Sequence, residues 1–356
     1  MSLNAGWYLG SDHRRIRSAL NTGFTAAAVR SYYAVFKVVA EQICEQLESF
    51  PSAATDVCSL LSAATLEATC QAILGCPTQD LGEEFVANNR EIIKLTASQS
   101  EVHVLADAIV SRLPTWVWRV VIHLPTKIFA VAHRGRFLGN QVGGRIVREK
   151  KEATAQGLEA GSDLFSRLAD PNNSDMLAEE DLVPQAGVVL VAGQETTTNT
   201  ISFGLFELAK HPDFQNKLRA EIYSALGNNT TLAYESMPLL NAFIREILRL
   251  YPAVPLSDCI VLEDTVIPLG ESVMSSRGKP INQIPVRKDE IVTMAFAAYQ
   301  RLPSRWGKDP HLFNPSRWLD GETYQGEAVG PYANLLSFFG GPHICLGITI
   351  DLPGVG

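Results

Sequence analysis

The stretch that most constrains this chain lies near its carboxyl end, where residues 337–348 are S-F-F-G-G-P-H-I-C-L-G-I. Its one cysteine, Cys345, follows two glycines and Pro342 and precedes Gly347. Glycine lets a backbone approach a flat ligand and adopt positive φ, and proline fixes one turn. Such a turn can present the sulfur and stabilise a thiolate with backbone N–H groups. A glycine-rich turn around a buried free cysteine explains the same residues equally well.

The bulk composition predicts a globular protein that does not bind nucleic acid. The 356 residues are 46% hydrophobic and 19% charged, with a net charge of −8 and a pI near 5.5, so there is no basic footprint. The six cysteines show no C-x-x-C spacing, which argues against a zinc site or a disulfide framework. No run reaches the roughly 18–20 uninterrupted apolar residues of a spanning helix. We therefore expect this chain, as given, to be soluble or peripheral.

Hydrophobic periodicity predicts a mainly α chain with a small β region. The helices are expected at residues 11–21, 26–50, 56–74, 81–95, 113–132, 136–156, 178–210, 212–226 and 239–250. Short β-branched runs at 259–262, 265–268 and 291–296 predict one small sheet within 259–296. In the first helix Ser11 or Asp12 is the expected N-cap.

The predicted helix at 178–210 would span about 45 Å, enough to cross a domain. At its middle stands A-G-Q-E-T-T-T, residues 192–198. A glycine beside β-branched hydroxyl residues weakens and bends a helix, which is a poor choice in a purely structural rod. The other interpretation is a helix kink packed against its neighbours.

Two charged pairs lie at helical spacing. His13 and Arg17 are four apart and share a face, which by itself indicates only a solvated basic surface. Glu246 and Arg249 are three apart, and an exposed pair of that kind is worth only about 0.2–0.5 kcal/mol.

Taken together, these segments resemble the cytochrome P-450 superfamily of heme-thiolate monooxygenases, from about residue 10 to residue 347. The family pattern F-x-x-G-x-R-x-C-x-G falls on Phe338, Gly341, His343, Cys345 and Gly347, with His343 where the family usually has Arg. The resemblance implies that Cys345 is the axial ligand of the iron of heme b and pushes electron density into it.

The resemblance also assigns roles in the central helix, whose A-G-x-[D/E]-T-T match begins at Ala192. It implies that Gly193 leaves room for dioxygen, that Thr196 hydrogen-bonds the bound oxygen, and that Glu195 helps to deliver protons.

The remaining assignments concern propionate binding and the scaffold. The resemblance implies that His13, Arg17 and His343 contact the heme propionates. A histidine at 343 can carry charge but lacks the arginine fork, so heme retention is expected to depend on pH. Glu246, Arg249 and Arg317, the last from P-S-R-W at 315–318, would form a buried structural triad.

The activity implied by the resemblance is monooxygenation of a small apolar substrate by dioxygen, with electrons from NADPH-cytochrome P-450 reductase at the endoplasmic reticulum membrane. The spacing around residues 277–286 resembles fungal members. Three alternatives stay open: a heme-thiolate isomerase or dehydratase, a truncated non-catalytic fragment without stable heme, and a helical binding scaffold that never binds heme. Retention of the acid–threonine pair disfavours the first.

Compared with the family, the chain is expected to be truncated at both ends. Relative to the family, the expected missing parts are an N-terminal anchor segment and the helix and strands that follow the cysteine loop at 337–347. Residues 348–356 form an atypical tail. We therefore expect a single partial domain over 1–356.

Overall fold

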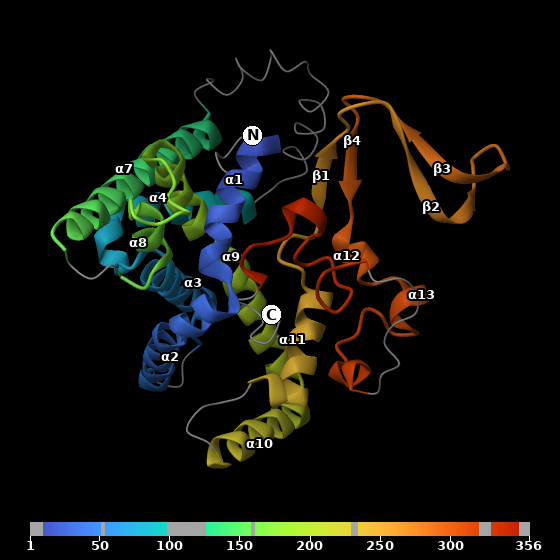
Figure 1. The fold of residues 1–356 in the computed structure, drawn as a ribbon. Helices are drawn as coiled ribbons and strands as arrows, with labels where there is room; N and C mark the ends of the chain where they lie inside the picture. The colour runs from blue at the N-terminus through green and yellow to red at the C-terminus, as the bar shows by residue number, and fades with distance from the viewer. Residues whose placement is uncertain are drawn as a thin grey trace. The chain divides into compact units, whose positions relative to one another are not determined.

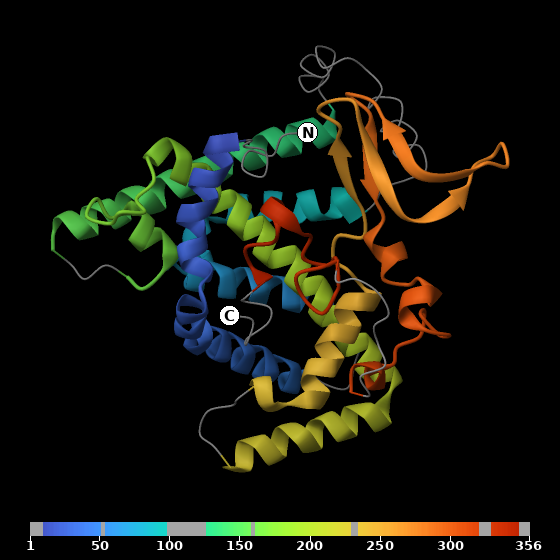
Figure 2. The ribbon, with the colours of Figure 1, turned by 45° about the vertical axis from the view of Figure 1, so that its right-hand side comes forward.

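The computed structural model describes residues 10–50, 54–97, 126–157, 161–228, 234–319 and 329–348. The predicted positions 113–125 and the tail from 349 onward lie outside these residues. The described chain is mostly helical with short antiparallel strands, so the predicted class is confirmed (Figures 1 and 2). It divides into two compact units, Met1–Ser202 with Leu346–Gly356 and Phe203–Cys345. The single partial domain stays a prediction, and each unit is described by itself.

The first unit is a helical body built around one apolar core. Cys70, Leu74, Phe165 and Leu190 are fully buried in that core. The helical elements are α1 (Gly10–Asn21), η1 (Thr22–Phe24), α2 (Ala26–Ser49), α3 (Val57–Thr69), the π-turn η2 (Cys70–Leu74), η3 (Thr78–Leu81), α4 (Glu83–Ala97), α7 (Lys127–Ala155), α8 (Leu164–Ala169) and α9 (Glu179–Lys210), which continues into the second unit.

Side-chain caps fix where several of these helices begin. The Asp163 carboxylate accepts from Ser166 N at 2.8 Å ahead of α8, and Thr126 Oγ1 accepts from Phe129 N at 3.3 Å ahead of α7. The predicted cap of α1 is wrong, because the helix already begins at Gly10 and places Ser11 in its first turn. Gly10 has φ of +67°, a left-handed conformation that costs glycine little.

Among the described helices, the segment Val57–Leu74 is the one candidate for crossing a membrane by length and composition. Its mean hydropathy is 1.5, and 39% of it is buried within the protein. Leu66, Ile73 and Leu74 belong to the core of the first unit, so packing against other helices already explains this apolar content.

The second unit joins helices to two separate two-stranded sheets, where the sequence predicted a single sheet. Strand β1 (Ser257–Ile260) pairs with β4 (Ile291–Met294), and β2 (Thr265–Met274) pairs with β3 (Pro280–Val286), both antiparallel. Strand β3 was missed because prolines normally argue against a strand, but a two-stranded ribbon consists of edges that tolerate them. The β2–β3 hairpin projects away from the helices of its unit (Figures 1 and 2).

The helical elements of the second unit follow in chain order. They are α10 (Pro212–Asn228), η4 (Tyr234–Ser236), α11 (Pro238–Leu250), α12 (Phe296–Tyr299), α13 (Pro303–Trp306), η5 (Pro315–Trp318) and η6 (Gly341–His343).

A buried carboxylate, Glu246 of α11, organises the polar interior of the second unit. Its two oxygens accept two bonds from Arg249, at 2.8 and 2.9 Å, and one from Arg317 Nε at 3.1 Å. Trp318 Nε1 and the Asn314 backbone N–H donate two more, at 2.9 and 2.8 Å. Glu246 and Arg249 are fully buried and Arg317 is 10% exposed, so both arginines expected in the triad contact the buried carboxylate directly.

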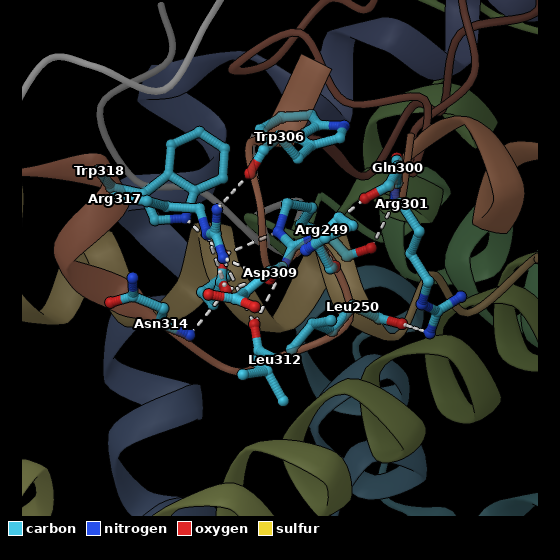
Figure 3. Close-up of polar contacts among 12 residues, drawn as sticks. Arg249, Leu250, Gln300, Arg301, Trp306, Asp309, Leu312, Asn314, Arg317 and Trp318 are labelled. Carbon is cyan, nitrogen blue, oxygen red and sulfur yellow. Dashed lines mark hydrogen bonds and ion pairs between the residues drawn. The ribbon is translucent and has the colours of Figure 1, made fainter. Parts of the chain in front are cut away.

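The remaining guanidinium N–H groups support the irregular chain between α12 and η5 (Figure 3). Arg249 donates to the carbonyls of Gln300, Pro310 and Leu312. Arg317 donates to those of Trp306, at 2.8 Å, and Asp309, at 3.2 Å. This stretch has little regular secondary structure, so the two arginines supply hydrogen bonds that a helix or sheet would otherwise provide.

We expect Glu246→Gln to lower the free energy of unfolding by about 3–5 kcal/mol, because two buried guanidiniums would lose their countercharge. Urea denaturation measures the loss. The control is Glu179→Gln, which removes the carboxylate of a surface pair with Lys151 and should cost much less because solvent screens that pair. A loss for Glu246→Gln no larger than that of the control would contradict the structural role of the triad.

Candidate cysteine and acid–threonine site

The cysteine loop is closed by backbone hydrogen bonds. Cys345 N donates to Phe338 O at 2.9 Å, and Phe339 N donates to Leu336 O at 2.9 Å. Within the loop from Phe338 to Cys345, Phe339 and Gly341 have positive φ angles of 61° and 65°. The left-handed conformation at a bulky phenylalanine is strained and is maintained by the surrounding contacts. The glycine and proline spacing therefore builds a tight loop that ends at the cysteine.

Side-chain packing anchors one end of this loop and leaves the cysteine accessible. Phe338 is only 6% exposed and packs edge-on against Tyr332 with ring centroids 6.3 Å apart. Cys345 and His343 are exposed. The interpretation of Cys345 as a small buried hydrophobe is therefore wrong, because the loop turns this residue outward. Leu346, which belongs to the first unit, packs against the core of that unit, and Gly347 is partly buried.

A single accessible sulfur suits a metal that brings most of its own ligands. Within the described ranges, no group of three or more His, Cys, Asp or Glu side chains could hold a bare metal ion. A porphyrin supplies four nitrogen ligands and needs only an axial group from the protein, as a thiolate provides. The donor set at Cys345 therefore fits heme.

Helix α9 carries the predicted acid–threonine pair in the first unit. Thr196 Oγ1 bonds back to Ala192 O at 2.7 Å, and Thr200 Oγ1 bonds to Thr196 O at 2.9 Å. The helix stays continuous through these threonines from Glu179 to Lys210. Packing alone also explains a glycine at position 193, beside its predicted role of leaving room for dioxygen. A Cβ there would lie 2.7 Å from Thr69 Oγ1 of α3.

Burial changes the acidity of the carboxyl group in this pair. Glu195 is half-buried, and desolvation raises the pKa of its carboxyl group above its ordinary value. The shift favours the protonated form of this carboxyl group over that of an exposed glutamate, which suits an acid that donates protons.

The sequence reasoning missed a buried polar network behind this pair. The Gln194 side-chain amide accepts from Asn89 Nδ2 at 2.5 Å and donates to Ser62 Oγ at 2.8 Å. Thr65 Oγ1 lies 2.7 Å from Thr198 Oγ1, and Thr198 Oγ1 also bonds to Gln194 O at 2.7 Å. The network ties α9 to α3 and α4. Its sequence signal was the i,i+4 spacing of Gln194 and Thr198 in an apolar helix.

Two further predicted residues lie on α1. His13 and Arg17 are partly buried and one turn apart, while Ile16, Ala19 and Leu20 face the core of the first unit. His13 and Arg17 share the first unit with Glu195 and Thr196, whereas Cys345 and His343 belong to the second unit.

Comparison with known proteins agrees with this geometry. The family model described as cytochrome P-450 matches residues 8–350. A ganoderic acid synthetase of Ganoderma lucidum is 30% identical, with 96% of this chain and 68% of the relative covered. A cytochrome P-450 monooxygenase of Postia placenta, numbered 91, is 31% identical over the same shares. The predicted similarity to fungal members is thereby confirmed.

Solved structures give the same fold. A cyanobacterial cytochrome P-450 with bound retinoic acid superposes with a TM-score of 0.71 at 21% identity, covering 98% of this chain and 71% of the other. Members of this family hold heme through a cysteine thiolate and act as monooxygenases on dioxygen, with electrons from a redox partner. On the extent of the family match and the two fungal relatives, this chain belongs to the cytochrome P-450 family and is an oxidoreductase of the monooxygenase type.

Proposed function

We propose that Cys345 is the axial thiolate ligand of heme b and that the protein inserts one oxygen atom into a small apolar substrate. The observation that carries this proposal is the closed loop from Phe338 to Cys345, which presents an exposed cysteine at the position of the family's cysteine motif. When bound, the heme supplies oxygen activation and electron transfer. His13, Arg17 and His343 are proposed to bind its propionates.

The protein's own part in the reaction is proton delivery. We assign that role to the Glu195 carboxyl group, with Thr196 Oγ1 as the neighbouring hydroxyl that would hydrogen-bond dioxygen once heme is in place. The raised pKa of Glu195 supports this assignment because burial favours the protonated form of its carboxyl group. The Gln194 network supports it by holding the opposite side of α9 in one position.

The electrons are proposed to come from NADPH through NADPH-cytochrome P-450 reductase, a flavoprotein. Two electrons and two protons reduce the second oxygen atom to water, while the first atom enters a C–H bond of the substrate. These assignments rest on the kinship of the chain with cytochrome P-450 monooxygenases. Association with the endoplasmic reticulum membrane is proposed on the same grounds of kinship.

The proposed ligand is tested by Cys345→Ser. We expect the wild-type protein to show a thiolate-type Soret band when it is reduced and treated with carbon monoxide, and the variant to lose that band because serine offers no thiolate. The control is Cys259→Ser, which removes another exposed thiol of the same unit and should leave the spectrum unchanged. Equal spectra and equal porphyrin content in wild type and Cys345→Ser would rule out the assignment.

The half-buried carboxyl group of Glu195 should make the stability of the fold depend on pH. Because the pKa of Glu195 is raised in the folded state, the folded protein binds this proton more tightly than the unfolded chain, and stability falls as the pH rises above the ordinary value of 4.5. Glu195→Gln has no proton to lose there. We expect its Tm to exceed that of wild type near neutral pH, with the difference shrinking toward acid pH.

Glu179→Gln is the control of opposite sign. A hydrogen bond and charge from Lys151 lower the pKa of Glu179, so this carboxylate stabilises the fold at neutral pH and less in acid. Its replacement should lower the Tm slightly at neutral pH. Thermal melts across the acid-to-neutral range compare the two variants, and a Glu195→Gln curve parallel to wild type at every pH would contradict the burial effect.

A further inference from the structure

The carboxyl end of α11 is capped by residues distant in the sequence. The last four carbonyls of a helix have no partner within it and need other donors. Here the donors are Tyr251 N to Ile247 O at 2.8 Å, Gln300 Nε2 to Leu248 O and Arg249 O at 3.0 Å each, Ser337 Oγ to Leu248 O at 2.8 Å, and the Arg301 guanidinium to Leu250 O. All four carbonyls are therefore satisfied.

Gln300 occupies a special place among these caps because its side chain reaches in two directions. Its amide nitrogen donates to α11, while its Oε1 accepts from Leu336 N at 2.8 Å and lies 3.1 Å from Ser337 Oγ. The residue is 0% exposed, and both ends of its amide are hydrogen-bonded. Its backbone carbonyl also accepts from Arg249 Nη1 at 2.9 Å, a contact visible in Figure 3.

The two residues that Gln300 holds stand at the start of the cysteine loop. Leu336 O accepts from Phe339 N, the next carbonyl acceptor in the loop is Phe338 O, and its donor is Cys345 N. A chain of hydrogen bonds thus runs from the last turn of α11, through one buried amide, to the closing bond at Cys345. The triad fixes Arg249 in that same last turn.

We propose that Gln300 is a positioning residue for Cys345. Its side chain hydrogen-bonds the carboxyl end of α11 and the start of the cysteine loop together, and thereby fixes where the loop places the sulfur. This role deepens the proposed heme-thiolate function and rests on it. Glutamine suits the position because two donors and one acceptor are needed on one uncharged group. A carboxylate would lack the donors, and an apolar side chain would leave Leu336 N and two helix carbonyls without these partners.

The test compares Gln300→Met with Arg301→Met. Both variants remove caps from the end of α11, but the Arg301 guanidinium bonds to Leu250 O and Ala297 O, neither of which lies in the cysteine loop. We expect both to lower the Tm. Only Gln300→Met should accelerate amide hydrogen exchange at Leu336 and Cys345, by about tenfold or more, since the loop loses a buried acceptor.

The second readout is the reduced carbon monoxide spectrum. We expect Gln300→Met to lower the ratio of thiolate-type to non-thiolate complex about tenfold relative to Arg301→Met. If Gln300→Met fails to fold, Ser337→Ala removes the hydroxyl contacts to Gln300 and Leu248 alone, and should shift both readouts in the same direction by a smaller factor.

Different outcomes would contradict the positioning role of Gln300 and the proposed heme-thiolate function. Equal loop exchange and equal thiolate ratios in Gln300→Met and Arg301→Met would overturn the positioning role. A wild-type protein without any thiolate band would refute the proposed function, and with it the role of Gln300 toward an iron ligand, even if the exchange at Leu336 still responded.

Discussion

The second unit depends on one buried carboxylate. Glu246 is fully buried and receives five hydrogen bonds, and its charge is balanced by the buried guanidinium of Arg249 and the partly buried one of Arg317. Burial of these charges is costly unless every donor and acceptor is used. The geometry meets that requirement, because further N–H groups of Arg249 and Arg317 donate to backbone carbonyls of the irregular chain. The charge network thereby holds a segment with little helix or sheet of its own.

The same polar interior leads to the cysteine loop through an uncharged group. Gln300 uses its amide on α11 and on Leu336 together, so the loop is held by hydrogen bonds and by the packing of Phe338 on Tyr332. A tight loop with positive φ at Phe339 needs such support, since its backbone cannot form a regular ladder. These contacts hold the loop in the conformation that the proposed role of Cys345 as an iron ligand requires.

In the first unit, helix α9 is held by polar contacts next to the proposed acid–threonine pair. Gln194 and Thr198 bond to α3 and α4, and Gly193 lies close to Thr69. These contacts fix the rotation of the helix about its axis, and therefore the direction in which Glu195 and Thr196 point. Desolvation raises the pKa of Glu195 in the position that results.

Local sequence patterns were enough to predict the helical class, the approximate bounds of α9 and α11, and the residues of the motifs, because periodicity and short spacings are local properties. They could not place β3, the start of α1 at Gly10 or the outward turn of Cys345. Those depend on edge pairing, on one backbone angle and on distant packing. Only the tertiary structure brought Gln300 and Leu336 together, because their hydrogen bond joins residues 36 positions apart that no local pattern connects.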